Sequence, residues 1–380
     1  MKRQVEIDLA KELLGLHADK SAFLDDSVSS SAVEDYFSED RFALERDRIF
    51  RKTPQPLVHS SELPEPGSFL RRDFAGLPVF FTRDDSGEAH AFLNVCRHRG
   101  TRLVDEQQGC KKRFSCPYHA WTWNNRGELI GIPHEKLGFP DVDKSQLGLR
   151  RLNCTERYGF VWVNANPDAS LDIDDFMSGL APELDWFESA DHVVLHTDVL
   201  ECAANWKILV EGGIEAYHFR VAHRDTIAPH FLDNLSSYQR FGMHMRTIIA
   251  KRSLLELNDQ PEEDWRLRDH AQVLYSIFPT NQLLVMGDHF AWTQSQPLSA
   301  STSRLRINTV VPKDRLTTDE DLAHWAKNHE ITITTLREDF AIGESIQAGL
   351  QSGANERLTF GRFEGALNAF NQCIEDHVSG

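Results

Sequence analysis

A chain of 380 residues is long enough to form two domains with separate cores. Its net charge of −17 argues against general binding to nucleic acid or to anionic lipid surfaces. No run of eighteen apolar residues is present, so no transmembrane helix is predicted. Six cysteines without a secretory signal indicate a reducing, cytoplasmic environment in which some thiols serve as ligands.

The N-terminal half predicts helices followed by a small β-domain. Residues 1–45 space their apolar side chains at three and four, and we interpret them as helices that pack on the C-terminal domain rather than as a signal peptide. Residues 46–165 consist of short alternating runs separated by Gly-containing turns. This pattern of alternating runs and turns predicts an antiparallel β-domain.

Residues 166–380 predict a second, larger domain. A linker with helices is followed by CAANWKILVEGGIEAYHF, which is typical of a strand leading into a helix, and by alternating strands over 240–312. A long helix, or a broken pair, follows over 317–353. The order of elements indicates an α+β fold. No Gly-rich dinucleotide fingerprint is present, so the chain is not expected to bind NAD or FAD itself.

Two short motifs pair a cysteine with a histidine. Cys96-x-His98 is followed seventeen residues later by Cys116-x-x-His119. Four such donors can bind one zinc ion, or a Rieske [2Fe–2S] cluster in which two cysteines bind one iron and two histidines the other. Zinc motifs usually place cysteines in one pair and histidines in the other, whereas each motif here supplies one of each. The order therefore favours the Rieske cluster, with zinc as the alternative.

A second set of candidate ligands lies in NWKILVEGGIEAYHFRVAH, which contains Glu215, His218 and His223. On a helix, Glu215 and His218 share a face. His218 and His223 lie roughly 140° apart on a straight helix, so they converge on one metal only if the helix ends between them. Two histidines and a carboxylate that leave open positions are typical of non-heme Fe(II) oxygenases.

Asp339 is the candidate carboxylate because it falls within an apolar stripe of the late helix, where a charge needs a partner or a metal. A helix cap or an ion pair with Arg337 is the alternative for Asp339, and a single histidine is usually structural. Glu338 and Glu344 face other directions on the same helix and are expected to be exposed to solvent.

Together these residues resemble the oxygenase component (α subunit) of Rieske non-heme iron oxygenases. The resemblance covers nearly the whole chain and rests on CRHRG…CPYHAWTW, on NWK…E…EAYH….H and on EDFAIGESIQAGLQSG. It implies a Rieske antiparallel β-domain followed by a helix-grip (START/Bet v 1-like) catalytic domain with an antiparallel sheet. It also implies a trimer of α subunits, and we expect a homotrimer here; whether a small β subunit is present does not follow from the sequence.

The resemblance implies two cofactors and a division of the site residues between them. The cluster ligands are Cys96, His98, Cys116 and His119, and the ligands of a mononuclear Fe(II) are His218, His223 and Asp339. Glu215 is implied to bridge from the iron site to a Rieske histidine, His119 of the partner subunit. Electrons would come from a separate NAD(P)H-dependent reductase, and O₂ would oxidise a small organic substrate, by monooxygenation or dioxygenation.

Two departures from the family pattern bear on the substrate. Glu211-Gly212-Gly213 stands where many relatives read Glu-Asn-aromatic, so a polar group near the iron is expected to be missing. Glu215 stands where ring-dihydroxylating members usually have Asp, which is similar to members that act on choline, carnitine and betaines. This favours hydroxylation or N-demethylation of a small quaternary amine.

A quaternary amine would be expected to bind in an aromatic cage. Candidates are Tyr275, Phe278, Phe290 and Trp292. Two alternatives stay open. One is a ring-hydroxylating oxygenase that acts on an aromatic acid and needs an arginine in its pocket. The other is a Rieske electron-transfer protein without oxygenase activity.

Overall fold

The computed structural model describes residues 1–169 and 171–379, which fall into two compact units. One unit joins Met1–Ile49 to Met177–Gly380, and Phe50–Phe176 forms the other. We call Phe50–Phe176 the β-unit. It extends beyond the predicted boundary at residue 165 because residues 171–176 pack on it. The Phe176 and Trp162 ring centroids lie 6.1 Å apart, and Asp174 pairs with Arg157 at 2.9 Å.

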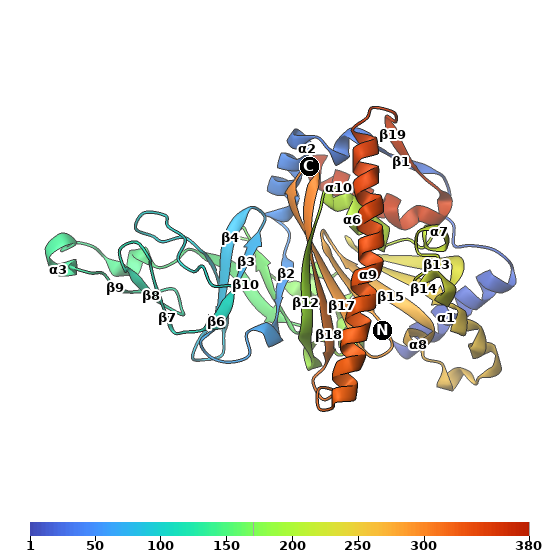
Figure 1. The fold of residues 1–380 in the computed structure, drawn as a ribbon, viewed down its shortest axis with the longest axis horizontal. Coiled ribbons are helices and arrows are strands. Elements are labelled where there is room, and N and C mark those ends of the chain that lie inside the picture. The colour runs from blue at the N-terminus through green and yellow to red at the C-terminus, as the bar shows by residue number, and fades with distance from the viewer. Residues whose placement is uncertain (170, 380) are drawn as a thin grey trace. The chain divides into compact units, whose positions relative to one another are not determined.

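The β-unit is built from an antiparallel sheet and a smaller one beside it (Figure 1). The main sheet has the order β2-β11-β10-β5-β4-β3-β6, and the smaller has the order β7-β8-β9. Its elements are β2 (Gln55–His59), β3 (Ser68–Phe74), β4 (Leu77–Arg83), β5 (Ala89–Leu93), β6 (Gln108–Cys110), β7 (Arg113–Ser115), β8 (Thr122–Asn124), β9 (Leu129–Gly131), α3 (Glu135–Gly138), β10 (Arg151–Arg157), β11 (Phe160–Asn164) and α4 (Ile173–Phe176).

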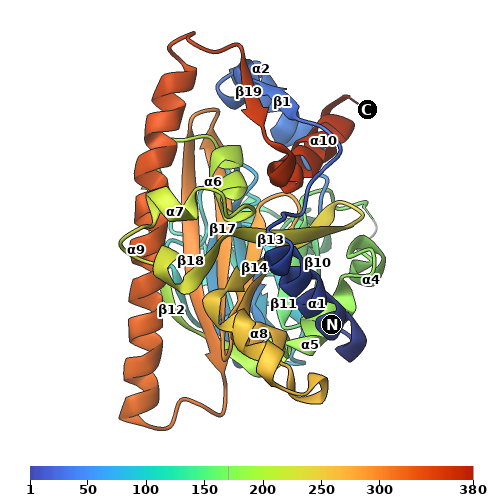
Figure 2. The ribbon, with the colours of Figure 1, turned by 90° about the vertical axis from the view of Figure 1, so that its right-hand side faces the viewer.

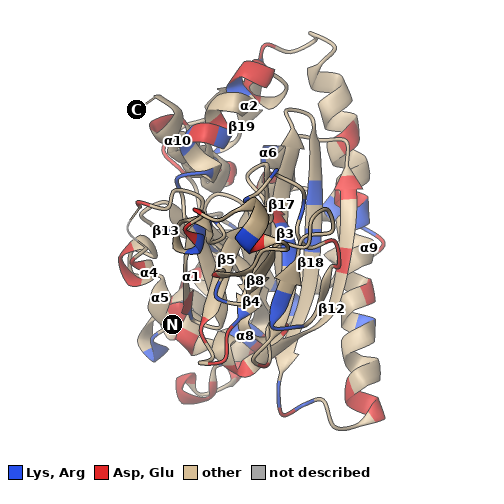
Figure 3. Cartoon of the chain, turned by 90° about the vertical axis from the view of Figure 1, so that its left-hand side faces the viewer, with Lys and Arg blue, Asp and Glu red and all other residues tan. Residues whose placement is uncertain are grey.

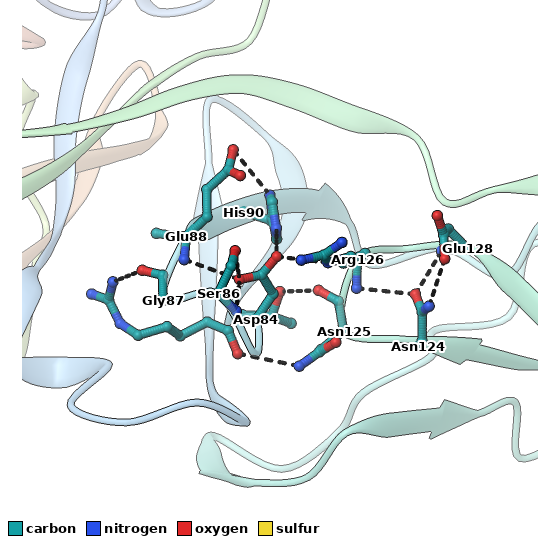
Figure 4. A network of polar contacts seen from close by, with 12 residues as sticks. Asp84, Ser86, Gly87, Glu88, His90, Asn124, Asn125, Arg126 and Glu128 are labelled. Carbon is teal, nitrogen blue, oxygen red and sulfur yellow. Dashed lines mark hydrogen bonds and ion pairs between the residues drawn. The ribbon is translucent and has the colours of Figure 1, made fainter.

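A buried carboxylate, Asp84, ties the turn between β4 and β5 to the turn between β8 and β9 (Figure 4). Its Oδ1 accepts hydrogen bonds from Ser86 N, Ser86 Oγ and Glu88 N at 2.6–3.0 Å. Its Oδ2 lies 3.2 Å from His90 Nε2 and 2.8 Å from Arg126 Nε. The group Asp84, Glu88 and His90 has its donors close together, but Arg126 and the backbone already satisfy Asp84. We therefore read it as structural.

The larger unit, Met1–Ile49 with Met177–Gly380, consists of one large antiparallel sheet, a two-stranded ribbon and surrounding helices (Figures 1 and 2). The large sheet has the order β12-β18-β17-β16-β15-β14-β13. Its strands are β12 (His192–Cys202), β13 (Phe231–Phe241), β14 (His244–Lys251), β15 (Ala271–Ile277), β16 (Asn281–Val285), β17 (Phe290–Ser299) and β18 (Thr302–Pro312), and the ribbon pairs β1 (Ser29–Ala32) with β19 (Arg357–Phe360).

The helices of this unit are α1 (Arg3–Ala18), α2 (Glu39–Glu45), α5 (Ala181–Trp186), α6 (Trp206–Gly213), α7 (Phe219–Ala222), α8 (Leu267–His270), α9 (Asp319–Leu350) and α10 (Gly365–Ser379). None of the described helices combines the length and apolar composition needed to cross a bilayer.

The helix α9 is one continuous helix that runs along the sheet, which is the predicted helix-grip arrangement (Figure 2). Thr318 caps its N-terminus by accepting from Asp321 N. Ile333 and Phe340 of α9 pack with Leu305 of β18, while acidic side chains are spread along the helix (Figure 3). The apolar side chains therefore attach α9 to the sheet.

The N-terminal segment is attached to α6 by a buried ion pair. Glu45 of α2 and Lys207 are both almost fully buried, and Lys207 Nζ lies 2.5 Å from Glu45 Oε1. Trp206 Nε1 donates to Glu45 Oε2 at 2.8 Å. A buried pair of this kind is costly to break because loss of one partner leaves an uncompensated charge.

The end of α6 is set by Gly213 and by Gln282 of β16. In a continuing helix the Val210 carbonyl would accept from Ile214 N. Instead Ile214 N donates to Glu211 O, and Gln282 Nε2 donates to Val210 O at 3.0 Å. A Cβ at Gly213 would lie 2.7 Å from Gln282 Nε2, so only glycine leaves room for this capping amide.

We expect Asp84→Ala to lower the free energy of unfolding of the β-unit by about 2–4 kcal/mol, because it removes a buried, fully hydrogen-bonded charge. Burial disfavours ionisation of Asp84, but hydrogen bonds from Ser86, His90 and Glu88 N outweigh it and lower its pKa below the ordinary 3.8. Because the fold lowers the pKa of Asp84, its ionised carboxylate stabilises the protein above about pH 4, and this stabilisation is lost as the pH falls. The free energy of unfolding measured in urea should therefore decrease more steeply below pH 4 for the wild type than for the variant. Asp85→Ala is the control, because Asp85 is exposed and pairs only with exposed Lys112.

We expect Gly213→Ala to be less stable than Gly212→Ala by about 1–3 kcal/mol, although both replace a glycine of α6 with a better helix former. The Gly213 side chain would displace the Gln282 amide and leave the Val210 carbonyl without its donor. A Cβ at Gly212 meets nothing within 4 Å. Urea unfolding followed by circular dichroism measures the difference, and equal stabilities would contradict this account of the helix end.

Candidate metal centres and cavity

The two Cys/His motifs form loops that are built alike. Gly100 N donates to Cys96 O at 3.0 Å, and Ala120 N donates to Cys116 O at 2.9 Å. Gly100 and Ala120 both have positive φ, +80° and +55°, which closes each turn tightly. The same local backbone thus presents one cysteine and one histidine from each loop.

The cysteine side chains of these loops, which could bind a metal, are buried, and both histidines have a ring nitrogen without a hydrogen-bond partner. Cys96 and Cys116 are each 4% exposed. The Nδ1 atoms of His98 and His119 are buried and have no hydrogen-bond partner, and the two imidazole centroids lie 4.8 Å apart. Trp121 stacks on His98 at 4.7 Å and an interplanar angle of 7°. Orphaned buried imidazole nitrogens are expected where a metal binds.

The donor set fits a [2Fe–2S] cluster better than a single zinc ion. A single ion needs all its donors within a few ångströms of one another. Among the described residues, the groups whose donor atoms come within 4.8 Å of one another do not include these four. Donors that face each other across a wider gap suit a cluster of two irons and two sulfides.

The residues His218, His223 and Asp339 do converge on one point. His218 precedes the short helix α7, His223 follows it, and Asp339 belongs to α9. His223 Nε2 lies 3.2 Å from His218 Nε2 and 2.9 Å from Asp339 Oδ1, and His218 Nε2 lies 3.6 Å from Asp339 Oδ1. Three lone pairs directed at one point fit a divalent cation with open positions on the other side.

Each of the two histidines is oriented by a carboxylate behind it. Glu215 Oε1 is hydrogen-bonded to His218 Nδ1. Glu338 Oε2 lies 2.8 Å from His223 Nδ1 and also accepts from Thr226 Oγ1 at 2.8 Å. A carboxylate can only accept, so it holds the proton on Nδ1 and leaves Nε2 free to bind a metal.

Two expectations about this region are wrong. Glu215 and His218 do not lie on a helix, because α6 already ends at Gly213; a turn brings them together instead. Glu338 is half-buried and bound to His223 rather than solvated. Glu344 is exposed, as predicted, and accepts from Ala203 N at 3.0 Å. Nothing in the spacing along α9 distinguishes Glu338 as an orienting residue, since its partner comes from a distant loop.

A cavity of about 440 Å³ opens beside the three converging residues. Its wall is mainly aliphatic, with side chains such as Ile208, Leu274 and Met286 and the ring of Phe340. Among the described residues, no lysine, arginine, tryptophan or tyrosine lines it. The polar groups of the wall include the carboxyl of Glu211, which belongs to the last turn of α6.

The predicted aromatic cage is not found in this wall. Tyr275 and Trp292 are fully buried elsewhere, with Tyr275 Oη bound to Glu183 and Trp292 Nε1 bound to Asn281. Phe278 and Phe290 are also absent from the cavity wall. The alternation of the strands could not reveal which face borders the cavity.

Burial raises the pKa of the Glu211 carboxyl to about 7. Hydrogen bonds from Tyr36 and Asn371 and the positive charge of Lys207 lower it and offset the burial only in part, while Glu364 raises it further. The cavity wall therefore contains a carboxyl group that changes charge near neutral pH.

Both units match known protein families. Residues 53–144 match the family described as Rieske [2Fe-2S] domain, and residues 189–380 match the family described as Ring hydroxylating alpha subunit (catalytic domain).

Three relatives illustrate the range of the similarity. The glycine betaine monooxygenase oxygenase subunit of Pseudomonas aeruginosa is 26% identical over 366 residues, covering 86% of this chain and 83% of the relative. The anthranilate 1,2-dioxygenase large subunit of Acinetobacter baylyi is 30% identical over 202 residues, and this chain spans only 43% of its length. A solved quaternary ammonium Rieske monooxygenase, described for carnitine oxidation and inter-subunit electron transfer, superimposes with a TM-score of 0.78 at 25% identity, covering 92% of this chain and 96% of that one.

The catalytic-domain match covers half of the chain, and the Rieske match covers the β-unit that precedes it. Members of this family are multicomponent oxidoreductases that use O₂ and a reductase, and their cofactors are a Rieske [2Fe–2S] cluster and a mononuclear iron. The chain belongs to the ring-hydroxylating α-subunit family and is a Rieske oxygenase.

Proposed function

We propose that this chain is the oxygenase component that hydroxylates or N-demethylates a small quaternary amine with O₂ and electrons from a separate NAD(P)H-dependent reductase. The observation that carries the proposal is the set of three converging donors beside a cavity whose wall, as far as the structure describes it, holds the acidic residue Glu211 and no lysine or arginine. The glycine betaine relative, matched over most of both chains, supports the same substrate class. Among the described residues of the wall, no lysine or arginine is present to bind the carboxylate of an aromatic acid, and the same observation favours a quaternary amine without a carboxylate over a betaine.

Within this proposal the seven donors divide between two metal centres. The [2Fe–2S] ligands are Cys96, His98, Cys116 and His119, and the iron ligands are His218, His223 and Asp339. The mononuclear iron, when bound, supplies the site at which O₂ is activated beside the substrate.

The chain's own residues supply orientation and a dry pocket. Glu215 and Glu338 hold the protons of His218 and His223 on Nδ1, so that both Nε2 atoms face the metal position. The aliphatic wall excludes water and keeps a substrate next to that position. Ligand orientation and exclusion of water are thus properties of the folded chain itself.

A head-to-tail homotrimer would bring the two kinds of centre together between subunits. Exposed apolar side chains accompany both kinds of centre: Tyr118 precedes His119, Tyr217 precedes His218, and Val221 lies in α7 between His218 and His223. We propose that Glu215 connects His218 to His119 of the partner subunit. Such exposed side chains next to polar functional groups are typical of surfaces that bind a partner.

The first test concerns metal content. We expect His223→Ala, purified anaerobically, to fall from about three irons per chain to about two while the sulfide content and the Rieske EPR signal persist. The control is His230→Ala, which replaces an exposed histidine of the same region and should keep about three irons. Zinc in place of iron, or loss of the Rieske signal in His223→Ala, would contradict the assignment of ligands.

The second test concerns Glu215. We expect Glu215→Gln to keep both metals but to lose nearly all substrate-dependent NADH consumption, because the amide cannot accept from two histidines as a carboxylate does. Reoxidation of the reduced cluster by O₂ and substrate, followed by its visible absorbance, measures the step directly. Asp225→Asn, which alters an exposed carboxylate of the same loop, is the control. Full activity in Glu215→Gln would rule out the bridging role.

A further inference from the structure

The cavity contains one carboxyl group that neither metal centre uses. Glu215 and Asp339 also line the cavity, but both contact the histidines of the metal site. Glu211 contacts neither of them by hydrogen bond; its partners are neutral donors from other elements. A carboxyl group buried to this extent without a basic partner is costly, so a role in binding is the explanation to test.

The two oxygens of Glu211 have different surroundings. Oε1 accepts from Tyr36 Oη at 2.6 Å and from Asn371 Nδ2 at 2.8 Å. Oε2 accepts no hydrogen bond from any residue that the structure describes. The side chain is 7% exposed and lines the cavity. Oε1 is therefore anchored, while Oε2 of this cavity-lining residue keeps its capacity to accept from a ligand.

The positive charge closest in sequence, that of Lys207, already forms an ion pair with another carboxylate. Lys207, one turn earlier on α6, directs its Nζ to Glu45 and not to Glu211. With no lysine or arginine in the described part of the wall, an ionised Glu211 would be the uncompensated charge on this side of the cavity. A cation that enters the cavity would find its counter-charge there.

A quaternary ammonium group fits these surroundings. It has no N–H to donate, so it needs a negative charge nearby and apolar surfaces for its methyl groups. The aliphatic wall offers the surfaces and Glu211 the charge. We propose that Glu211 is a substrate-binding residue that pairs with the ammonium group of the substrate; this inference rests on the proposed function.

This pairing predicts a proton linkage. The groups that face Glu211 are Tyr36, Asn371, Lys207 and Glu364, and together with burial they hold its pKa at about 7. A bound cation favours the ionised carboxylate and so lowers this pKa. Binding below pH 7 should therefore release a proton, and affinity for a cation should rise as the pH increases through 7.

The experiment uses the metal-loaded protein and two probes of the same shape, choline and its neutral isostere 3,3-dimethylbutan-1-ol. Isothermal titration calorimetry at pH 6 and pH 8.5, in buffers of different ionisation enthalpy, gives both affinity and proton release. We expect the wild type to prefer choline at pH 8.5 and to release close to one proton per choline at pH 6. Glu211→Gln should weaken choline binding by about tenfold or more and leave the isostere unchanged.

Two further variants keep the test decisive. Glu364→Gln removes a carboxylate near Glu211 but outside the cavity wall, and should retain the preference for choline. Tyr36→Phe keeps the carboxyl but removes a hydrogen bond that lowers its pKa, so the rise in choline affinity should move to higher pH. The inference is overturned if neither probe binds, if both bind equally to the wild type, or if Glu211→Gln leaves choline binding unchanged.

Failure of this inference differs from failure of the proposed function. NADH consumption with a surrogate reductase reports oxidation of choline, whereas calorimetry reports binding alone. Glu211-dependent binding of choline without oxidation of any amine would retain the binding site and refute the proposed function. Oxidation of choline by Glu211→Gln with an unchanged KM would retain the function and refute the role of Glu211.

Discussion

The end of α6 at Gly213 is the constraint on which the catalytic centre depends. The Gln282 amide donates a hydrogen bond to the Val210 carbonyl, and the lack of a Cβ at Gly213 leaves room for this amide. Had the helix continued, His218 and His223 would point in directions about 140° apart and could not share a metal. Because α6 ends before His218, the two histidines instead flank the separate short helix α7 and meet Asp339 of α9.

A second principle of this structure is that its buried carboxylates have defined partners. Glu45 binds Lys207, and Asp84 binds Arg126 and two backbone N–H groups. These pairs join segments far apart in the sequence and offset the cost of burying charge. Glu211 is different, because its donors are neutral and one oxygen is left over. That difference, and not its position in a motif, singles it out.

Several features followed from the sequence because their signals are local. The paired Cys/His spacing of residues 96–119 specified two tight loops with one donor pair each, and alternating strands broken by glycine turns specified an antiparallel β-domain. The family resemblance, and with it both cofactors, rested on these motifs and on the spacing of His218 and His223. The long helix was also foreseeable from its cap at Thr318, although a single helix and a broken pair could not be told apart.

The tertiary structure alone decided what surrounds those residues. The sequence by itself determined the fold class and the family and supplied the candidate donor residues, since ligand types and turn residues act over a few positions. Which side chains line the cavity depended on how a strand face meets α9, and for that reason Tyr275, Phe278, Phe290 and Trp292 could only be candidates for an aromatic cage; none of the four lines the cavity. Glu338, Gln282 and Glu211 obtain their roles from partners that lie 72 or more positions away. Burial and the pKa of a carboxyl are properties of such non-local contacts, which no spacing along the chain encodes.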